Sequence, residues 1–170
     1  MSTSPARLFA AIVSHEGAAA VIHGPSGAGK SAVLANLERR AAAAGWRTHR
    51  ASRDATERYV PYAAVRALFD PAPALLDVAT RPIAETALSL YWHCAGLARQ
   101  RPIALFVDDA QWADRASLKV LAQLARRTRN LPLLLVLATR PPEDDADPDV
   151  PAVFGALPGV ESVCLQARAA

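Results

Sequence analysis

The sequence predicts an α/β protein in which a parallel sheet is covered by helices on both faces. Short apolar runs alternate along the chain with longer segments of helical periodicity, and the runs at residues 103–107 and 133–138 contain no polar residue. Fully apolar strands separated by helices are typical of parallel sheets that are buried on both sides. With 170 residues, of which 52% are hydrophobic, the chain has the size of one domain with its own core.

The strands are predicted from short runs that are bounded by turn residues or by helical segments. The first run, AAAVIH, is apolar except for its last residue and is followed directly by a glycine. The second run has the weakest pattern, because polar and basic residues interrupt it. The predicted strands cover residues 18–23, 48–51, 103–107, 133–138 and 161–165.

The helices are predicted from apolar residues that recur every three or four positions. The segment 30–44 brings Leu34, Leu37 and Ala41 to one face, and Gly45 is placed to end it. The segment 61–69 opens on a proline, which suits the first turn of a helix. The remaining predicted helices cover residues 83–99 and a segment that begins after residue 114.

Composition argues against several classes of protein. The net charge is only +3, and the basic residues are spread along the chain, so direct binding to nucleic acid is not predicted. The two cysteines occur in unrelated contexts, which favours free thiols over a disulfide or a metal site. No apolar run has the length of a membrane span and no leader pattern opens the chain, so we expect a cytoplasmic protein without membrane contact.

Polar residues directly follow three of the predicted strands. Gly24 follows the first strand, Asp108 follows the run at 103–107, and the run at 133–138 leads through Thr139 to Arg140. In open parallel sheets, ligands bind beyond the carboxyl ends of the strands. The sequence therefore predicts a ligand site at this edge of the sheet.

The first strand end carries the sequence GPSGAGKS, which matches the phosphate-loop pattern G-x-x-x-x-G-K-[ST] between a strand and a helix. Glycines allow the backbone to curl so that its N–H groups converge on phosphate oxygens, and the following helix adds the positive end of its dipole. The lysine is expected to reach the β- and γ-phosphates, and the serine hydroxyl to bind Mg²⁺. The predicted nucleotide-binding residues are Gly24, Pro25, Ser26, Gly27, Ala28, Gly29, Lys30 and Ser31.

Two adjacent carboxylates follow the strand at 103–107, in the sequence VDDAQWAD. A nucleotide-bound Mg²⁺ needs a carboxylate from a neighbouring strand, and Asp108 is predicted to supply it. Asp109 is predicted to orient or deprotonate the attacking water. Two adjacent acids resist joint ionisation, so the positive charge of Mg²⁺ and Lys30 would be needed beside them. Asp114 is expected to cap the following helix instead.

Arg140 is the third candidate for the catalytic site. If its strand lies between the acidic strand and the phosphate-loop strand, the guanidinium would come near the γ-phosphate and could report its presence. The alternative is an exposed arginine at a strand end. Thr139 is a weaker candidate for contact with the water, and Trp112 is expected either to pack under its loop or to stack on a base.

The stretches GPSGAGKS, YVPYAAVRALF, FVDDAQWADRASLKVLAQLARR and LLLVLATRP resemble the ATPase domain of large ATP-binding LuxR-type transcriptional regulators, relatives of the maltose-regulator group. The resemblance extends over residues 18–140. It implies a three-layer P-loop NTPase core with five strands, in which the phosphate-loop strand lies beside the strand that ends at Arg140. It also implies ATP as the ligand, with Asp108 on the metal, Asp109 in hydrolysis and Arg140 as sensor.

The same resemblance divides the chain into an N-terminal segment at residues 1–17, a nucleotide-binding core at 18–140, and an acidic loop with a last strand at 141–170. Such regulators continue into a helical lid and a DNA-binding region, for which this sequence has no counterpart, so we expect a core without a C-terminal lid. The hypotheses are a slowly hydrolysing ATP/ADP switch, a nucleotide-gated interaction module without catalysis, or a small-molecule P-loop kinase. Self-association, or binding to lid or effector domains on another chain, is the expected partnership.

Overall fold

The computed structural model describes residues 5–52, 56–69, 81–142 and 149–166. Most of the predicted acidic loop, residues 143–148, lies outside this part of the chain. None of the described helices is long and apolar enough to cross a membrane.

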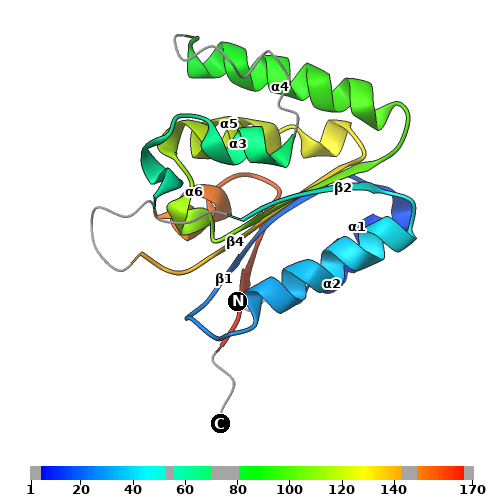
Figure 1. Ribbon diagram of the computed structural model, residues 1–170. Coiled ribbons are helices and arrows are strands. Elements are labelled where there is room, and N and C mark those ends of the chain that lie inside the picture. Colours follow the sequence, from blue (N-terminus) through cyan, green and yellow to red (C-terminus); the bar gives the residue numbers. More distant parts are fainter. Residues whose placement is uncertain (1–4, 53–55, 70–80, 143–148, 167–170) are drawn as a thin grey trace.

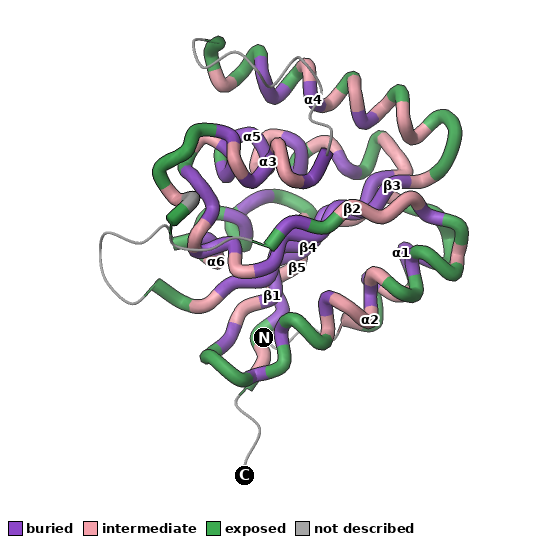
Figure 2. Tube along the Cα trace, in the orientation of Figure 1, coloured by how far each residue is buried: buried purple, intermediate pink, exposed green. Residues whose placement is uncertain are grey.

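Five parallel strands form one sheet in the order β2-β3-β4-β1-β5. Every residue of β3 and β4 is buried, as their apolar sequences predict (Figure 2). The predicted α/β class is confirmed, and β4 separates the acidic strand from the phosphate-loop strand. The strands are β1 (Ala18–His23), β2 (Arg47–Ser52), β3 (Ile103–Asp108), β4 (Leu133–Thr139) and β5 (Val160–Cys164).

Helices cover both faces of the sheet, which gives three layers (Figure 1). One face packs against α1 (Ala6–Ser14) and α2 (Lys30–Ala43), and the buried residues between them form one apolar cluster. A second cluster lies under the helices of the other face. Those helices are α3 (Ala63–Leu68), α4 (Ile83–Ala98), α5 (Arg115–Ala125) and α6 (Val150–Gly155).

The structure contains two helices that the sequence did not predict. In α1, Leu8 and Ile12 lie four residues apart and are both buried, and the Trp46 indole N–H donates to the Ile12 carbonyl at 3.0 Å. In α6, Asp149 caps the first turn by accepting from the Ala152 N–H at 2.9 Å. Both helices are short, so their patterns are too brief to stand out from those of loops.

Strand alternation decides which side chains face α2. Ala104 and Phe106 of β3 belong to the cluster under α1 and α2, whereas Leu105 and Val107 belong to the opposite cluster. Asp108 continues the first series because side chains alternate along a strand. Arg50 of β2 is in register with Phe106, so it lies on the same side of the sheet as Asp108.

The two cysteines differ in accessibility, and this allows a simple check of the fold. Cys94 of α4 is fully buried, and burial raises the pKa of its thiol to about 12, whereas Cys164 at the end of β5 is exposed. The thiolate is the reactive form, so we expect a thiol reagent to label one cysteine in the native protein and both after unfolding. Rapid labelling of two thiols under native conditions would contradict the packing of α4.

Candidate nucleotide-binding site

The phosphate loop lies where the sequence predicted it, between β1 and α2 at the carboxyl edge of the sheet. Gly27 and Gly29 have φ values of 76° and 86°, in the left-handed region that suits glycine. Gly24 is required for a different reason: a Cβ atom there would lie 2.3 Å from the carbonyl oxygen of Leu165. Ser31 is exposed on the first turn of α2, where its hydroxyl is accessible to a ligand.

Lys30 folds back onto its own loop. Its ammonium group donates to the carbonyl oxygens of Gly24 and Pro25, each at 2.8 Å, and the residue is buried. Burial lowers the pKa of Lys30, Asp109 raises it, Arg140 lowers it and Asp108 raises it, in decreasing order of effect. The charges of Asp108, Asp109 and Arg140 therefore all act on the ammonium group.

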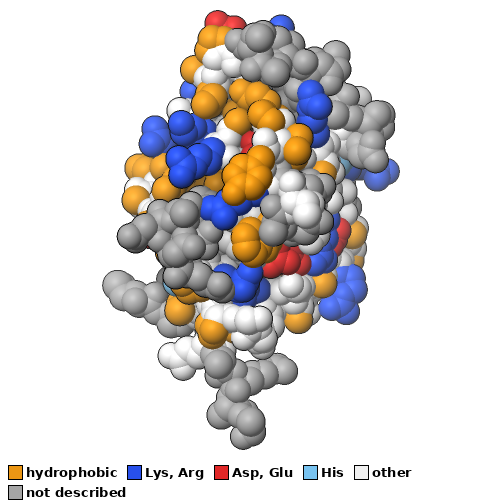
Figure 3. Space-filling view, turned by 60° about the vertical axis from the view of Figure 1, so that its left-hand side comes forward, with side chains coloured by type: hydrophobic (Ala, Val, Ile, Leu, Met, Phe, Trp, Pro, Cys, Tyr) orange, Lys and Arg blue, Asp and Glu red, His pale blue; other side chains and the backbone are white. Residues whose placement is uncertain are grey.

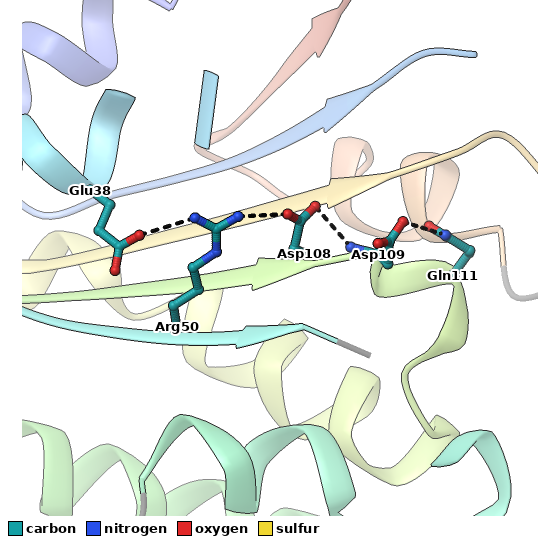
Figure 4. Close-up of polar contacts among 5 residues, drawn as sticks. All are labelled: Glu38, Arg50, Asp108, Asp109 and Gln111. Atoms are coloured by element: carbon teal, nitrogen blue, oxygen red, sulfur yellow. Dashed lines mark hydrogen bonds and ion pairs between the residues drawn. The ribbon is translucent and has the colours of Figure 1, made fainter. Parts of the chain in front are cut away.

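Asp108 ends β3 with its carboxylate almost completely buried, at 5% exposure for the residue. Its Oδ2 accepts from Nη2 of Arg50 at 2.7 Å, and the same guanidinium donates through Nη1 to Oε2 of Glu38 at 3.2 Å. Figure 4 shows this chain of contacts from α2 through β2 to β3. Burial lowers the pKa of Arg50, but its contacts with Asp108 and Glu38 together raise the pKa above its ordinary value, so the guanidinium stays charged.

Asp109 begins the turn after β3 in a left-handed conformation, with φ of 50°. Its backbone N–H donates to Oδ1 of Asp108 at 3.1 Å, and its own Oδ1 accepts from the Gln111 amide at 2.9 Å (Figure 4). The side-chain oxygen of Gln111, Oε1, in turn accepts from the Thr139 hydroxyl at 3.3 Å and from the backbone N–H of Arg140 at 3.1 Å. Gln111 thus ties the second acid to the end of β4.

Arg140 is half-buried, and its guanidinium lies 5.5 Å from the centre of the Trp112 ring. Arg58 lies over the same ring at 6.0 Å. Trp112 therefore makes cation–π contacts with arginine side chains. The sequence analysis had expected it to pack under its loop or to stack on a base. Trp112 thus lies against the side chain of the predicted sensor, which follows β4.

Asp114 does not join this site. It caps α5, as predicted, by accepting from the Ser117 N–H at 2.8 Å, and it also accepts from the Ser117 hydroxyl and from the N–H groups of Tyr62 and Ala64. These contacts connect α5 to α3. The role of Asp114 is to hold two helices together.

Two of the hollows that the described residues line differ in their relation to the site. One, of about 520 Å³, adjoins Ala28 and Gly29 of the phosphate loop and is lined by Phe9 and Val33 among others. The other, of about 560 Å³, lies between α4, α5 and α6 and is lined by none of the predicted site residues. Figure 3 brings forward a face of the molecule on which hydrophobic side chains lie among lysines and arginines.

The oxygen groups at this edge suit a nucleotide-bound Mg²⁺. Hydroxyl and carboxylate oxygens, here of Ser31 and Asp108, are the ligands that Mg²⁺ prefers, and the ion usually reaches a protein together with phosphate oxygens. Within the described residues, no group of three or more histidine, cysteine or acidic side chains could hold a metal ion by itself. The oxygens of Ser31 and Asp108 are chemically suited to a Mg²⁺ ion that also binds phosphate.

A phosphate loop after β1, paired acids at the end of β3 and an all-parallel sheet define a P-loop nucleotide-binding domain. Residues 6–136 match the AAA ATPase domain, and the chain belongs to this family. A comparison with curated proteins finds no match.

Solved structures support the same fold. Cdc6p from Pyrobaculum aerophilum aligns with a TM-score of 0.59 at 16% identity, over 94% of this chain and 42% of that chain. The ADP form of ORC2 from Aeropyrum pernix has a TM-score of 0.57 at 14% identity, over 95% and 46%. Drosophila ORC bound to DNA has a TM-score of 0.55 at 21% identity, over 90% and 39%. The chain spans less than half the length of each of these structures.

Three residues of this site were missed by the sequence analysis: Glu38, Arg50 and Gln111. Arg50 lies in the strand with the weakest pattern, and its contact with Asp108 depends on the register of β2 against β3. Gln111 follows the acid pair within the stretch DDAQWAD, so its position was a usable signal. Glu38 had no such signal, because a glutamate in an exposed helical segment is usually only solvated.

Proposed function

We propose that this AAA ATPase domain is a Mg²⁺-dependent switch that binds ATP and hydrolyses it slowly. The observation that carries the proposal is that the phosphate loop after β1 and the acid pair at the end of β3 lie at the same carboxyl edge of the sheet, with only β4 between their strands. A triphosphate on the loop would bring its negative charge beside the ammonium group of Lys30, which would exchange the Gly24 and Pro25 carbonyls for phosphate oxygens.

Each predicted residue then has a distinct task. The backbone N–H groups of the loop and Lys30 hold the phosphates, and Ser31 and Asp108 hold Mg²⁺, which when bound neutralises charge on the β- and γ-phosphates. Asp109 accepts the proton of the attacking water. Arg140, oriented by Trp112, contacts the γ-phosphate and responds to its loss. The hollow beside Ala28 and Gly29, with the aromatic ring of Phe9 in its lining, is a suitable place for the adenine ring of ATP.

The test of this proposal is Asp109→Asn. Asparagine retains the oxygen that accepts from Gln111, so the turn is preserved while the proton acceptor is lost. We expect phosphate release to fall by about 10²-fold or more, the usual contribution of a general base, while ATP binding is retained. Calorimetry with ATP and a phosphate-release assay measure the two effects, and Asp149→Asn, an exposed cap on α6, is the control. Equal turnover in wild type and Asp109→Asn would exclude Asp109 as the base.

A nucleotide-gated interaction module without catalysis is the second candidate. The observation in its favour is that both acids are already engaged, Asp108 by Arg50 and Asp109 by Gln111. A wild-type rate of phosphate release equal to that of buffer, together with measurable ATP binding, would support this function instead.

We further propose that the domain serves a LuxR-type transcriptional regulator of the maltose-regulator kind. The stretches GPSGAGKS and DDAQWAD support this context. A lid or effector domain on another chain, or a second copy of this one, would then complete the adenine side of the site. Cross-linking in ATP and in ADP tests whether such an assembly depends on the γ-phosphate.

A further inference from the structure

Arg50 is a charged side chain at this edge of the sheet to which the proposed function gives no task. Its side chain is 30% exposed, and it joins the carboxylate of Asp108, which is 6% exposed, to that of Glu38, which is 28% exposed. The shorter contact, at 2.7 Å, is with Asp108, and the longer, at 3.2 Å, is with Glu38. Figure 4 shows the guanidinium between the two acids.

Both carboxylate oxygens of Asp108 are engaged in this arrangement. Arg50 holds Oδ2, and the backbone N–H of Asp109 holds Oδ1. A buried carboxylate without a positive partner is strongly unfavourable, so the guanidinium supplies the charge that Asp108 requires in the absence of a metal ion. The carboxylate predicted to serve Mg²⁺ is thus already neutralised by a side chain of the protein.

We propose that Arg50 is the counter-ion of Asp108 in the nucleotide-free protein and competes with Mg²⁺ for that carboxylate. This inference rests on the proposed function, because it concerns the metal that accompanies ATP. Two cations that share one carboxylate weaken each other's binding by mutual repulsion and by competition for the same oxygens. Arg50 is a positioning residue in this scheme and touches neither phosphate nor the attacking water.

Glu38 gives the displaced guanidinium a place to go. Nη1 of Arg50 already contacts its carboxylate, so the arginine can give up Asp108 without losing every ionic partner. Glu38 lies on α2, the helix that starts at the phosphate loop. The binding of Mg²⁺ would therefore change an ionic contact of that helix. Glu38 therefore lowers the cost of releasing Asp108, and its removal should tie Arg50 more firmly to Asp108.

The experiment measures how much Mg²⁺ is needed for ADP to stabilise the protein. Melting temperatures are recorded at saturating ADP over a MgCl₂ titration, so the readout does not depend on turnover. For Arg50→Gln we expect a lower melting temperature without Mg²⁺ and a half-saturating Mg²⁺ concentration about tenfold below that of wild type, which corresponds to about 1.4 kcal/mol. For Glu38→Gln we expect the opposite shift, to a higher Mg²⁺ concentration.

The matched control is Arg47→Gln. Arg47 lies on the same strand but is in register with Ile103, which belongs to the opposite core cluster, so its loss should leave the Mg²⁺ requirement unchanged. If Arg50→Gln does not fold, Arg50→Lys and Glu38→Gln still decide the question. Lysine keeps the charge but cannot contact both carboxylates as the guanidinium does. Arg50→Lys should therefore lower the half-saturating Mg²⁺ concentration as Arg50→Gln does, but by a smaller factor.

The outcomes separate the inference from the proposed function. A merely structural pair would lower the melting temperature equally at every Mg²⁺ concentration, and an unchanged midpoint in Arg50→Gln would overturn the competition. A higher midpoint in that variant, or a lower one in Glu38→Gln, would also overturn it. If wild-type protein shows no stabilisation by ADP with or without Mg²⁺, the proposed nucleotide function itself fails, and the inference fails with it.

Discussion

Lys30→Ala is expected to reduce the affinity for ATP by a factor of about 100 or more. Lys30 is the buried lysine of the loop, and its ammonium group is held by two carbonyl oxygens of that loop, each at 2.8 Å. Alanine removes the charge that would bind the β- and γ-phosphates, and charge-assisted contacts of this kind are the strongest polar contacts a site can make. Isothermal calorimetry with ATP and Mg²⁺ measures the loss.

The sequence supplies a matched control, because it contains only one other lysine. Lys119 is exposed on α5 and lines the hollow between α4, α5 and α6, away from the phosphate loop. Lys119→Ala should bind ATP as wild type does. Unfolding curves of both variants show whether the fold is intact. Undiminished ATP affinity in a folded Lys30→Ala protein would remove the basis for placing nucleotide at this loop.

The phosphate loop and the acid pair were predictable because their information is local. A few neighbouring residues are enough to identify the glycines and the lysine of the loop, and the apolar run before each strand end. A parallel sheet then brings the strand ends together. The neighbours of these residues were not predictable in the same way. Arg50 reaches Asp108 only in one register of β2 against β3, and a shift by one residue would turn it to the other face.

The fold shows the same division between local and long-range information. Strands β3 and β4 were predicted from their own apolar letters, whereas α1 was missed because its burial depends on Trp46 and α2. Capping of α5 by Asp114 was predicted, because a cap is a local contact. That the same carboxylate also holds α3, about fifty residues earlier in the chain, could be learned only from the structure.

This second contact leads to the largest expected effect on stability, that of Asp114→Ala. The residue is 3% exposed and accepts from four donors: the Ser117 N–H and hydroxyl, and the N–H groups of Tyr62 and Ala64. Alanine leaves all four buried donors without this acceptor, and we expect a loss of about 3–5 kcal/mol in the free energy of unfolding. Tyr62 adds to the loss, because its left-handed conformation, with φ of 62°, is held by the bond to Asp114.

Asp149→Ala separates this effect from ordinary helix capping. Asp149 caps α6 in the same way, through the Ala152 N–H at 2.9 Å, but it is exposed. Its replacement should cost about 1 kcal/mol, as is usual for a cap. Asp114→Asn keeps one acceptor oxygen and turns an amide toward the donors on the other side, so its loss should lie between those of the two alanine variants. Urea unfolding followed by circular dichroism gives all three values. Equal losses for Asp114→Ala and Asp149→Ala would mean that Asp114 acts as a local cap and that α3 is held against α5 by apolar packing alone.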